Sequence, residues 1–484
     1  MKLMTRKILA GAIAAMLIAG MTACSAEETA QTVSETSAAV EYLTRDDITV
    51  NETFTNEADG EHAIEADGEE ATYSNIGVTK TGEASGDEAD FYGENAAVFA
   101  TNGAVLTISD SLIETAGTHA NAVFSYGEGT VVNIADSVIE TTGNCSGGLM
   151  TTGGGTMNAE NLTINTSGNS SAAIRSDRGG GTVIVNGGYY KTTGTGSPVI
   201  YSTADITVND SYMESTASQG VVVEGKNSVT LNNDTLIADN NTKNSDKSDY
   251  YQAVMIYQSM SGDASVGTSS FTANGGSITN RNGDIFFVNN TATEISLSGV
   301  TITNEDAEGS FLRAEAAGWG NEGSNGGKVN LNASGQIIEG NMLVDEVSTL
   351  NLYLKDSSSF TGAINTDGQN GEVYVEIEDG STWTLTDDSY ISGLTVSDAG
   401  AIDLNGHKLY VDGKEYTSGS SSEGTAFDIS TDTGSGSGMP DGMPGDGQGG
   451  PGGNPPDGEP PEKPDGNGGN PPSGEPPEKP DGSN

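Results

Sequence analysis

The residues best suited to ligand chemistry in this chain are a few arginines in a strongly acidic sequence. The chain has 19 Lys and Arg against 69 Asp and Glu, which gives a formal net charge of −50. Arg175, Asp177 and Arg178 lie together in the segment AIRSDRGGG, and Arg313 lies in FLRAE. An exposed guanidinium can bind a carboxylate or sulfate through two hydrogen bonds, so Arg175, Arg178 and Arg313 are candidate ligand-binding residues. The alternative is local pairing of the first two arginines with Asp177 or Glu224.

Aromatic side chains form a second group of candidates, because planar rings on an exposed face can pack against sugar rings. Tyr250 and Tyr251 lie in the longest insertion, NTKNSDKSDYYQA, and Trp319 lies in another, AEAAGWGNEGSNGG. Insertions in a repeat protein often gather on its binding side. The alternative is that outward aromatics stack on each other between repeats and stiffen the molecule. The aromatic candidates are Tyr201, Tyr250, Tyr251, Tyr257 and Trp319.

Short acidic turns recur along the chain and could supply oxygen ligands to calcium. They lie at 109–111, 135–137, 209–211, 232–234 and 304–309. Their spacing matches neither the EF-hand loop nor the nonapeptide calcium repeat. Asp and Asn also favour turns for backbone reasons alone. Calcium is thus a candidate cofactor, and no residues are assigned as its ligands.

Catalysis has less support in the sequence than binding. The three histidines, His62, His119 and His407, belong to no recognisable catalytic motif. A glycosidase would need two carboxylates at a defined separation, and 69 acidic residues will always offer some pair. A lyase would need a basic residue beside a substrate carboxylate. The cluster to test for that role is Arg175, Asp177 and Asp205.

These candidates must be positioned by a series of repeats that runs from about Ala97 to Asn365. The chain divides there before short apolar triplets, and its period of about 22 to 33 residues is typical of a solenoid. The second residue of each triplet is apolar and can point inward in every repeat. The expected inward column is Val98, Val123, Leu149, Ile174, Ile200, Val222, Met255, Phe286, Leu312 and Leu343.

Each repeat has the pattern of a coil with three short strands. A second run such as VLTIS and a third such as SLIET follow the triplet, separated by Gly, Asn, Asp and Ser. These features predict an all-β fold, a single-stranded parallel β-helix. One coil cannot bury its apolar face alone, so the coils stack at roughly 4.8 Å and both ends need caps. We expect an N-terminal cap and first turns over 41–96, coils over 97–365, and closing coils and a cap over 366–417.

The two ends of the chain differ in composition from the repeats. Basic residues before an apolar run predict a signal peptide over 1–23. The segment MTAC resembles a bacterial lipobox, with Met in place of the usual Leu, and predicts lipid on Cys24 of an exported protein at the outer face of the cell membrane. The alternative is an ordinary cleaved signal peptide. Residues 24–40 are expected to be a flexible tether and residues 418–484, rich in Gly, Pro and Asp, a disordered tail with a tandem repeat.

Cys145 is the second of the two cysteines and the only thiol expected in the folded part. It lies in a turn, NCSGG, with no His or basic residue nearby in sequence. A reactive thiol needs such a partner, so the sequence predicts a packed residue rather than a nucleophile.

The net charge of −50 restricts the partners of the protein. Binding nucleic acid needs Lys and Arg to neutralise phosphates, so the charge excludes nucleic acid as a general partner. It also disfavours an anionic membrane surface, which leaves the lipid as the expected link to the membrane. It is compatible with divalent cations, basic ligands or simple solubility.

The coils from about Ala97 to Asn365 resemble the pectate-lyase-like, right-handed parallel β-helix superfamily. Within it, the chain is similar to lipid-anchored bacterial surface proteins described as carbohydrate-binding or adhesin-like, one family of which binds acidic plant polysaccharide with calcium and without lyase activity. The resemblance implies a surface protein that binds polysaccharide or another surface ligand without catalysis. The alternatives are a polysaccharide lyase or glycoside hydrolase, and a structural spacer or adhesin with a protein partner. A superfold hosts many functions, so this implication is an analogy.

Overall fold

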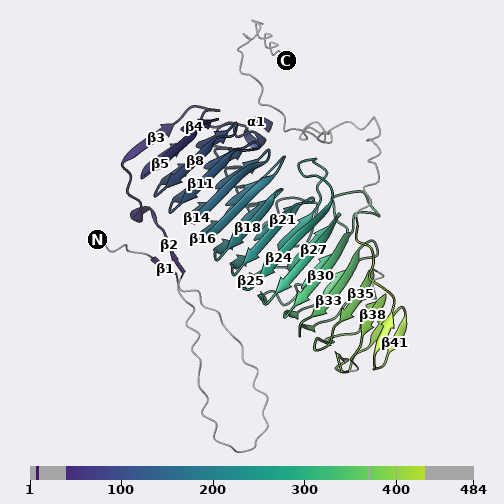
Figure 1. The fold of residues 1–484 in the computed structure, drawn as a ribbon. Helices are drawn as coiled ribbons and strands as arrows, with labels where there is room; N and C mark the ends of the chain where they lie inside the picture. The colour runs from purple at the N-terminus through teal and green to yellow at the C-terminus, as the bar shows by residue number, and fades with distance from the viewer. Residues whose placement is uncertain (1–6, 10–39, 369–370, 399, 431–484) are drawn as a thin grey trace, which may run out of the picture.

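The computed structural model describes residues 7–9, 40–368, 371–398 and 400–430 of the chain. Its regular elements are almost all β-strands, most of them in long parallel sheets, which is compatible with the predicted parallel β-helix (Figure 1). The predicted signal peptide, Cys24 and most of the tether and tail lie outside the described residues. Within the described part, we find no helix with the length and hydropathy that crossing a membrane requires.

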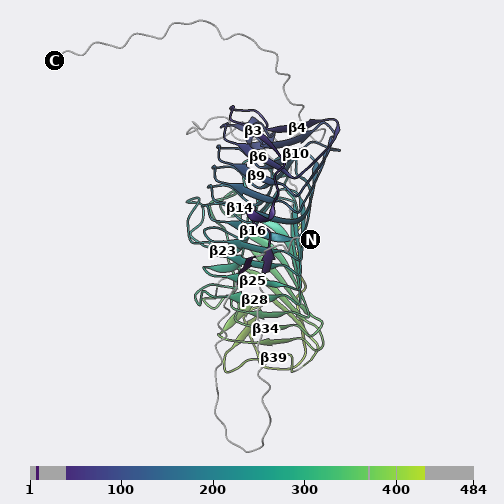
Figure 2. The same ribbon diagram turned by 90° about the vertical axis from the view of Figure 1, so that its left-hand side faces the viewer.

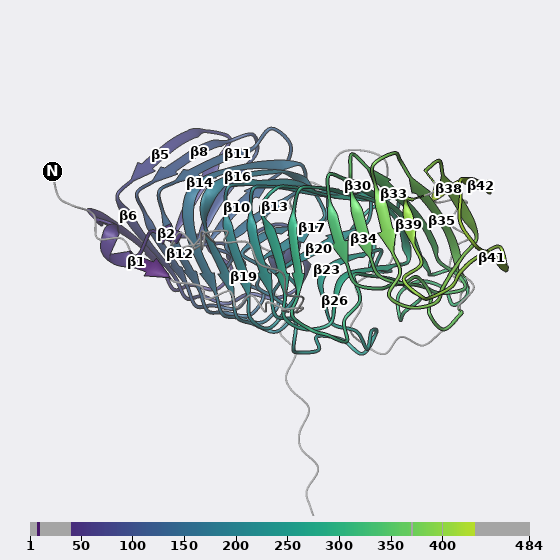
Figure 3. The same cartoon turned by 90° about the horizontal axis from the view of Figure 1, so that it is seen from below.

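The first strand of each coil belongs to an eleven-stranded parallel sheet, whose strands lie side by side in Figure 3. In order of pairing, the strands are β4 (Ile64–Asp67), β7 (Val98–Thr101), β10 (Val123–Tyr126), β13 (Leu149–Thr152), β15 (Ile174–Ser176), β17 (Ile200–Ser202), β20 (Val221–Glu224), β23 (Gln252–Tyr257), β26 (Asp284–Asn289), β29 (Leu312–Ala314) and β32 (Met342–Val344). Each strand pairs with the equivalent strand of the next coil, so the sheet runs along the molecule.

The second and third strands of most coils form a 22-stranded sheet. Its strands are β3 (Glu52–Asn56), β5 (Glu70–Ser74), β6 (Ile76–Lys80), β8 (Val105–Ser109), β9 (Leu112–Thr115), β11 (Val131–Ala135), β12 (Val138–Thr141), β14 (Gly155–Thr166), β16 (Gly181–Thr192), β18 (Asp205–Asn209), β19 (Tyr212–Ser215), β21 (Ser228–Asn232), β22 (Thr235–Ala238), β24 (Thr268–Asn274), β25 (Ser277–Asn280), β27 (Thr291–Ser298), β28 (Thr301–Asn304), β30 (Gly327–Ser334), β33 (Thr349–Lys355), β35 (Glu372–Ile377), β38 (Gly393–Val396) and β42 (Ser421–Glu423). Strand β14 pairs with both β11 and β12, which joins the second and third runs of the coil into one sheet.

Smaller elements complete the two ends. A four-stranded sheet contains β31 (Ile337–Glu339), β34 (Ser359–Thr361), β36 (Thr382–Thr384) and β39 (Ile402–Asp403), and a three-stranded sheet contains β37 (Ser389–Ile391), β40 (Leu409–Val411) and β41 (Lys414–Tyr416). Strands β1 (Lys7–Leu9) and β2 (Val40–Tyr42) form an antiparallel pair, and the helices are η1 (Arg45–Asp47) and α1 (Asp87–Phe91). The turned view in Figure 2 shows the coils stacked along the long axis.

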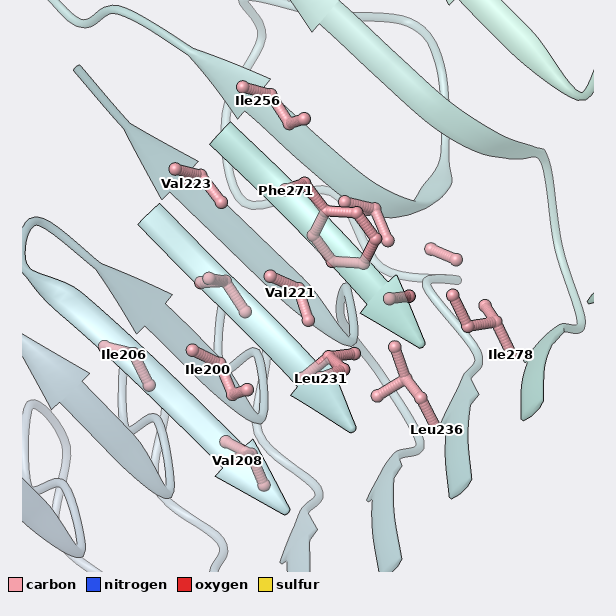
Figure 4. Close-up of a cluster of buried hydrophobic side chains, with 14 of the residues drawn as sticks. Ile200, Ile206, Val208, Val221, Val223, Leu231, Leu236, Ile256, Phe271 and Ile278 are labelled. Atoms are coloured by element: carbon pink, nitrogen blue, oxygen red, sulfur yellow. The ribbon is translucent and has the colours of Figure 1, made fainter. Parts of the chain in front are cut away.

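The inward side chains of the sheets form one buried core along the coils. In the eleven-stranded sheet the parallel register places one apolar residue over the next, for example Val123 over Val98. Figure 4 shows a part of this core, where Ile200 and Val221 lie among side chains from the 22-stranded sheet. The inward column is Ile64, Val98, Val123, Leu149, Ile174, Ile200, Val221, Val254, Phe286, Leu312 and Met342.

The predicted inward column is confirmed in seven coils and wrong in three. Val222, Met255 and Leu343 are in register with outward residues of neighbouring strands, and Val221, Val254 and Met342 take the inward places. In these coils the opening triplets are VVV, VMI and MLV. Because every position of such a triplet is apolar, alternation of hydropathy does not define which residue faces the core.

The packed structure continues past Ser418, where the sequence predicts the start of a disordered tail. Strand β42 pairs antiparallel with β38. The backbone N–H of Phe427 donates a hydrogen bond to Asn351 Oδ1, and Asn351 Nδ2 donates one to the carbonyl oxygen of Phe427. Ile429 is buried. The composition of this stretch resembles the tail, but it lies along an available sheet edge, and pairing there satisfies its backbone groups.

Candidate ligand-binding site

The outer face of the eleven-stranded sheet is the surface on which most predicted ligand residues gather. Successive residues of a strand point to opposite faces, so the residues after the inward column form an outward column. Arg175, Tyr201 and Arg313 all belong to it. The outward column is Glu65, Phe99, Phe124, Met150, Arg175, Tyr201, Val222, Met255, Phe287, Arg313 and Leu343.

The N-terminal part of this outer face is covered by the segment that contains α1. Phe99, Phe124 and Met150 are fully buried there, with Tyr92 packed against their cluster. The Thr152 hydroxyl donates a 2.7 Å hydrogen bond to the carbonyl oxygen of Phe91, which fixes the end of α1 over the sheet. Phe99 and Phe124 contact each other edge to face, with ring centroids 5.9 Å apart. These outward phenylalanines therefore stiffen the stack and do not contact solvent.

Arg175 and Arg178 are engaged with carboxylates of their own chain. One terminal nitrogen of Arg175 lies 2.8 Å from Asp177 Oδ2, and the Arg175 side chain is only 15% exposed. Arg178 lies 2.8 Å from Asp263 Oδ1, and its guanidinium stacks 3.8 Å from the centre of the Phe91 ring. Burial raises the pKa of the Asp177 carboxyl, and the charge of Arg175 opposes this. The alternative of local pairing with Asp177 therefore holds for Arg175, whereas the Arg178 side chain pairs with Asp263, a partner that the sequence does not predict.

Arg313 is held in the same way at the other end of the face. Its Nε lies 2.7 Å from Asp284 Oδ2, and a terminal nitrogen lies 3.1 Å from Glu315 Oε2. The Tyr250 ring covers the guanidinium at 3.9 Å, and the Tyr250 hydroxyl donates a 2.8 Å hydrogen bond to Glu315 Oε1. With these partners, the Arg313 guanidinium holds Tyr250 in place. Its hydrogen-bonding edges are occupied by carboxylates of the same chain and are not both free to bind a ligand.

A pocket of about 120 Å³ lies between these two arginine clusters. Five of the predicted ligand residues line it, and all of them are aromatic: Tyr201, Tyr250, Tyr251, Tyr257 and Trp319. Val222 and Met255, the outward residues that the sequence places in the core, are part of its wall. Its polar lining is supplied by Gln219, Asn240, Thr242, Lys243, Asn244, Ser245, Ser248 and Gln252.

A buried carboxylate fixes the tyrosines at the base of this pocket. Glu224 is 1% exposed, and its Oε2 accepts hydrogen bonds from the hydroxyls of Tyr201 and Tyr257, the latter at 3.0 Å. The two hydroxyl oxygens are 3.3 Å apart. Burial raises the pKa of Glu224, whereas hydrogen bonds from Ser259 and the two tyrosines lower it. The rings are therefore held in place before any ligand arrives.

Two insertions close the pocket from the side. Gly318 donates a 2.7 Å backbone hydrogen bond to Lys247, which joins the insertion after β22 to the insertion after β29. The Trp319 ring meets Tyr257 edge to face at 5.2 Å. Lys247 Nζ lies 5.9 Å from the centre of the Trp319 ring. The insertions thus bring polar and aromatic side chains from distant parts of the sequence to one place.

The predicted catalytic cluster of Arg175, Asp177 and Asp205 does not assemble. Arg175 lies on β15 of the eleven-stranded sheet, whereas Asp205 begins β18 of the 22-stranded sheet and is exposed. Asp205 accepts a 2.8 Å hydrogen bond from the Ser228 hydroxyl on the next coil. The few residues between β17 and β18 turn the chain from one sheet to the other, which separates residues that are close in sequence.

The acidic turns have a backbone explanation. Asp110, Asp136 and Asp210 have φ values of 50°, 47° and 52°, and Asn233 has 57°. Asp and Asn are the side chains that tolerate this left-handed conformation best after Gly. Within the described ranges, a single group of three His, Cys, Asp or Glu residues brings its ligand atoms within 4.8 Å of one another: Asp387, Asp388 and His407. That group lies in the last coils and does not line the pocket.

Sequence reasoning missed the polar lining of the pocket. Thr242, Lys243 and Asn244 belong to the same insertion as Tyr250 and Tyr251, so the insertion itself was the available signal. Gln219 lies just before β20, and nothing in its local sequence distinguishes it from other turn residues. No protein-family model matches this chain, and no curated protein matches it.

Proposed function

We propose that this protein is a non-catalytic, cell-surface lipoprotein that binds polysaccharide in the aromatic pocket on the outer face of the eleven-stranded sheet. In this proposal Cys24 bears the lipid, and residues 24–40 hold the coils away from the membrane. The coils wind in the right-handed sense, because parallel crossover connections are right-handed in nearly all sheets.

The observation that supports this function is the convergence of Tyr201, Tyr257 and Trp319 with amide side chains in one pocket. Sugar rings have apolar faces that pack on aromatic rings and hydroxyls that bond to amides. The bonds of Glu224 to two of the tyrosines fix the rings in advance, which lowers the entropy cost of binding.

The size of the pocket suits one small unit of a glycan. Its volume of about 120 Å³ lies below the range of pockets that enclose a drug-sized ligand. One sugar ring, at a chain end or on a branch, matches this space, and the rest of the glycan extends over the sheet. A long enclosed groove for a polymer backbone is not required.

In this proposal, calcium bridges the acidic protein and acidic glycans. A protein with a net charge of −50 repels a polyanion, and a divalent cation between the two reduces that repulsion. The described residues offer no three-ligand group of His, Cys, Asp or Glu at the pocket, so the ligand itself would supply part of the coordination. We therefore expect neutral glycans to bind equally well with calcium and with a chelator, and acidic glycans to bind only with calcium.

The test is retention of the purified protein on immobilised neutral and acidic polysaccharides. Tyr251→Ala and Trp319→Ala should each weaken binding about tenfold or more, which corresponds to about 1.4 kcal/mol. Tyr410→Ala is the matched control, because Tyr410 stacks on Tyr390 in the last coils at 4.9 Å, outside the pocket. This variant should bind like the wild type.

The same experiment separates the alternative functions. New reducing ends or unsaturated products would show a hydrolase or a lyase and would overturn the non-catalytic assignment. Equal weakening by the pocket variants and by Tyr410→Ala would exclude the pocket as the site. No retention on any glycan, with or without calcium, would leave the spacer or protein adhesin as the better account.

A further inference from the structure

The coil stack brings the one described thiol next to a histidine that is distant in sequence. His119 and Cys145 hold the same place in consecutive turns, TAGTHAN and TTGNCSG. Both have left-handed backbones, with φ of 57° and 56°. The His119 backbone N–H donates to Asn144 at 2.9 Å and that of Cys145 to Asn169 at 2.8 Å, so each turn lies on the next. The sequence has no histidine or basic residue near Cys145, but the stacking of the coils places His119 beside it.

A carboxylate from a third part of the chain orients this histidine. His119 Nδ1 lies 2.8 Å from Oδ1 of Asp90, which is part of α1, and the His119 side chain is 11% exposed. The stacking of the two turns also places the Cys145 side chain beside the His119 ring. The Asp90 carboxylate and the neighbouring Cys145 raise the pKa of His119 to about 9, although burial opposes this. The imidazole is thus protonated at neutral pH.

This arrangement has the parts of an activated nucleophile. Thiol–disulfide exchange proceeds through the thiolate, and a histidine beside the thiol can supply a proton to the leaving group. A third group that fixes the histidine completes the pattern of nucleophile, base and orienting residue. Cys145 is half-buried. Ser170 occupies the same place in the following turn with φ of 54°, and its side chain is also half-buried.

We propose that Cys145 is a nucleophilic modification site that exchanges with low-molecular-weight disulfides, independently of glycan binding. The Cys145 thiolate attacks one sulfur of the small disulfide, and a new bond forms between the two sulfurs. The sulfur–sulfur bond of the reagent breaks and releases one thiolate. The thiol proton is lost to solvent when the thiolate forms, and the protonated His119 ring passes a proton to the leaving thiolate, so the exchange needs no other oxidant or reductant.

The test measures the rate at which the purified protein reacts with 4,4′-dithiodipyridine, a small neutral disulfide, at mildly acidic pH. The control thiol is Ser170→Cys in a Cys145→Ser background, which has the same backbone conformation and similar exposure but lies two coils, about 10 Å, from His119. Cys145 should react at least about tenfold faster than this control thiol. His119→Gln and Asp90→Asn should each reduce the rate to that of the control.

His62→Gln serves as a histidine control and should leave the rate unchanged, and circular dichroism verifies that each variant is folded. Equal rates for Cys145 and the Ser170→Cys thiol would overturn the proposal. An unchanged rate in His119→Gln would do the same, because it would show that the thiol reacts without its partner. If a variant fails to fold, the comparison between Cys145 and the control thiol still decides the question.

Discussion

Arg175 and Arg313 occupy equivalent outward places on the eleven-stranded sheet, and both are committed to carboxylates of their own chain. Each side chain is 15% exposed. A guanidinium with so little contact to water must be paired, because leaving a buried charge uncompensated costs several kcal/mol. Asp177 and Asp284 meet this need. The aromatic side chains between them line the pocket that we propose as the ligand-binding surface.

Asp234 is 3% exposed, and its carboxylate accepts hydrogen bonds from the backbone N–H groups of Ser211 and Asn232. Burial raises the pKa of its carboxyl to about 7. The folded state therefore holds this proton more tightly than the unfolded chain, where the pKa is about 3.9. The free energy of unfolding should fall as the pH rises from about 4 to about 7, by up to about 4 kcal/mol from this group alone.

Asp234→Ser is the variant that isolates this effect. Ser occupies the equivalent place in other coils, where Ser137 accepts the backbone N–H of Ser111 at 3.1 Å. The variant should lose most of the decrease in stability between about pH 4.5 and about pH 8, as measured by urea denaturation. A variant with the same pH dependence as the wild type would show that the Asp234 carboxyl does not titrate in this range.

At the scale of elements, a column of glycines sets how closely successive coils can approach. Gly117, Gly143, Gly168 and Gly194 hold equivalent places in consecutive turns. A Cβ on Gly143 would lie 2.0 Å from the carbonyl oxygen of Gly117, and one on Gly168 would lie 1.8 Å from that of Gly143. Such distances are far inside van der Waals contact, so only Gly fits there.

Gly143→Ala should therefore destabilise the coils by about 1–3 kcal/mol or more, because the backbone must move apart. The matched control is Gly400→Ala, since Gly400 is exposed and the nearest atom to its Cβ position is 3.6 Å away. Denaturant unfolding followed by circular dichroism measures both. Equal stability of the two variants would contradict the close approach at Gly143.

The sequence predicts the elements better than their contacts. The period, the short Val- and Ile-rich runs and the turn residues are local signals, and they define the parallel coils and most of the inward column. The exceptions are Val222, Met255 and Leu343, where consecutive apolar residues leave the register undefined by hydropathy. Insertions in the sequence mark Tyr250, Tyr251 and Trp319, but their assembly with Tyr201 and Tyr257 into one pocket depends on the stacking of the coils. The proximity of Asp90, His119 and Cys145 depends on which coils become neighbours and on where α1 folds back.

At the scale of the whole molecule, the coils form a long stack whose outer face is covered at one end and open in the middle. The α1 segment buries Phe99 and Phe124. Farther along, the two insertions leave a pocket over Tyr201, Tyr257 and Trp319. The net charge of −50 disfavours the approach of polyanions. This pocket is the place at which we propose that a glycan binds.

The central claim is that this pocket is the ligand-binding site, and hydrogen–deuterium exchange with and without a retained glycan tests it most directly. The claim predicts new protection in residues 240–257 and 315–325, which form the two insertions and β23, and no change in residues 97–166. Protection confined to residues 97–166, or to the last coils around Asp387 and His407, would contradict it.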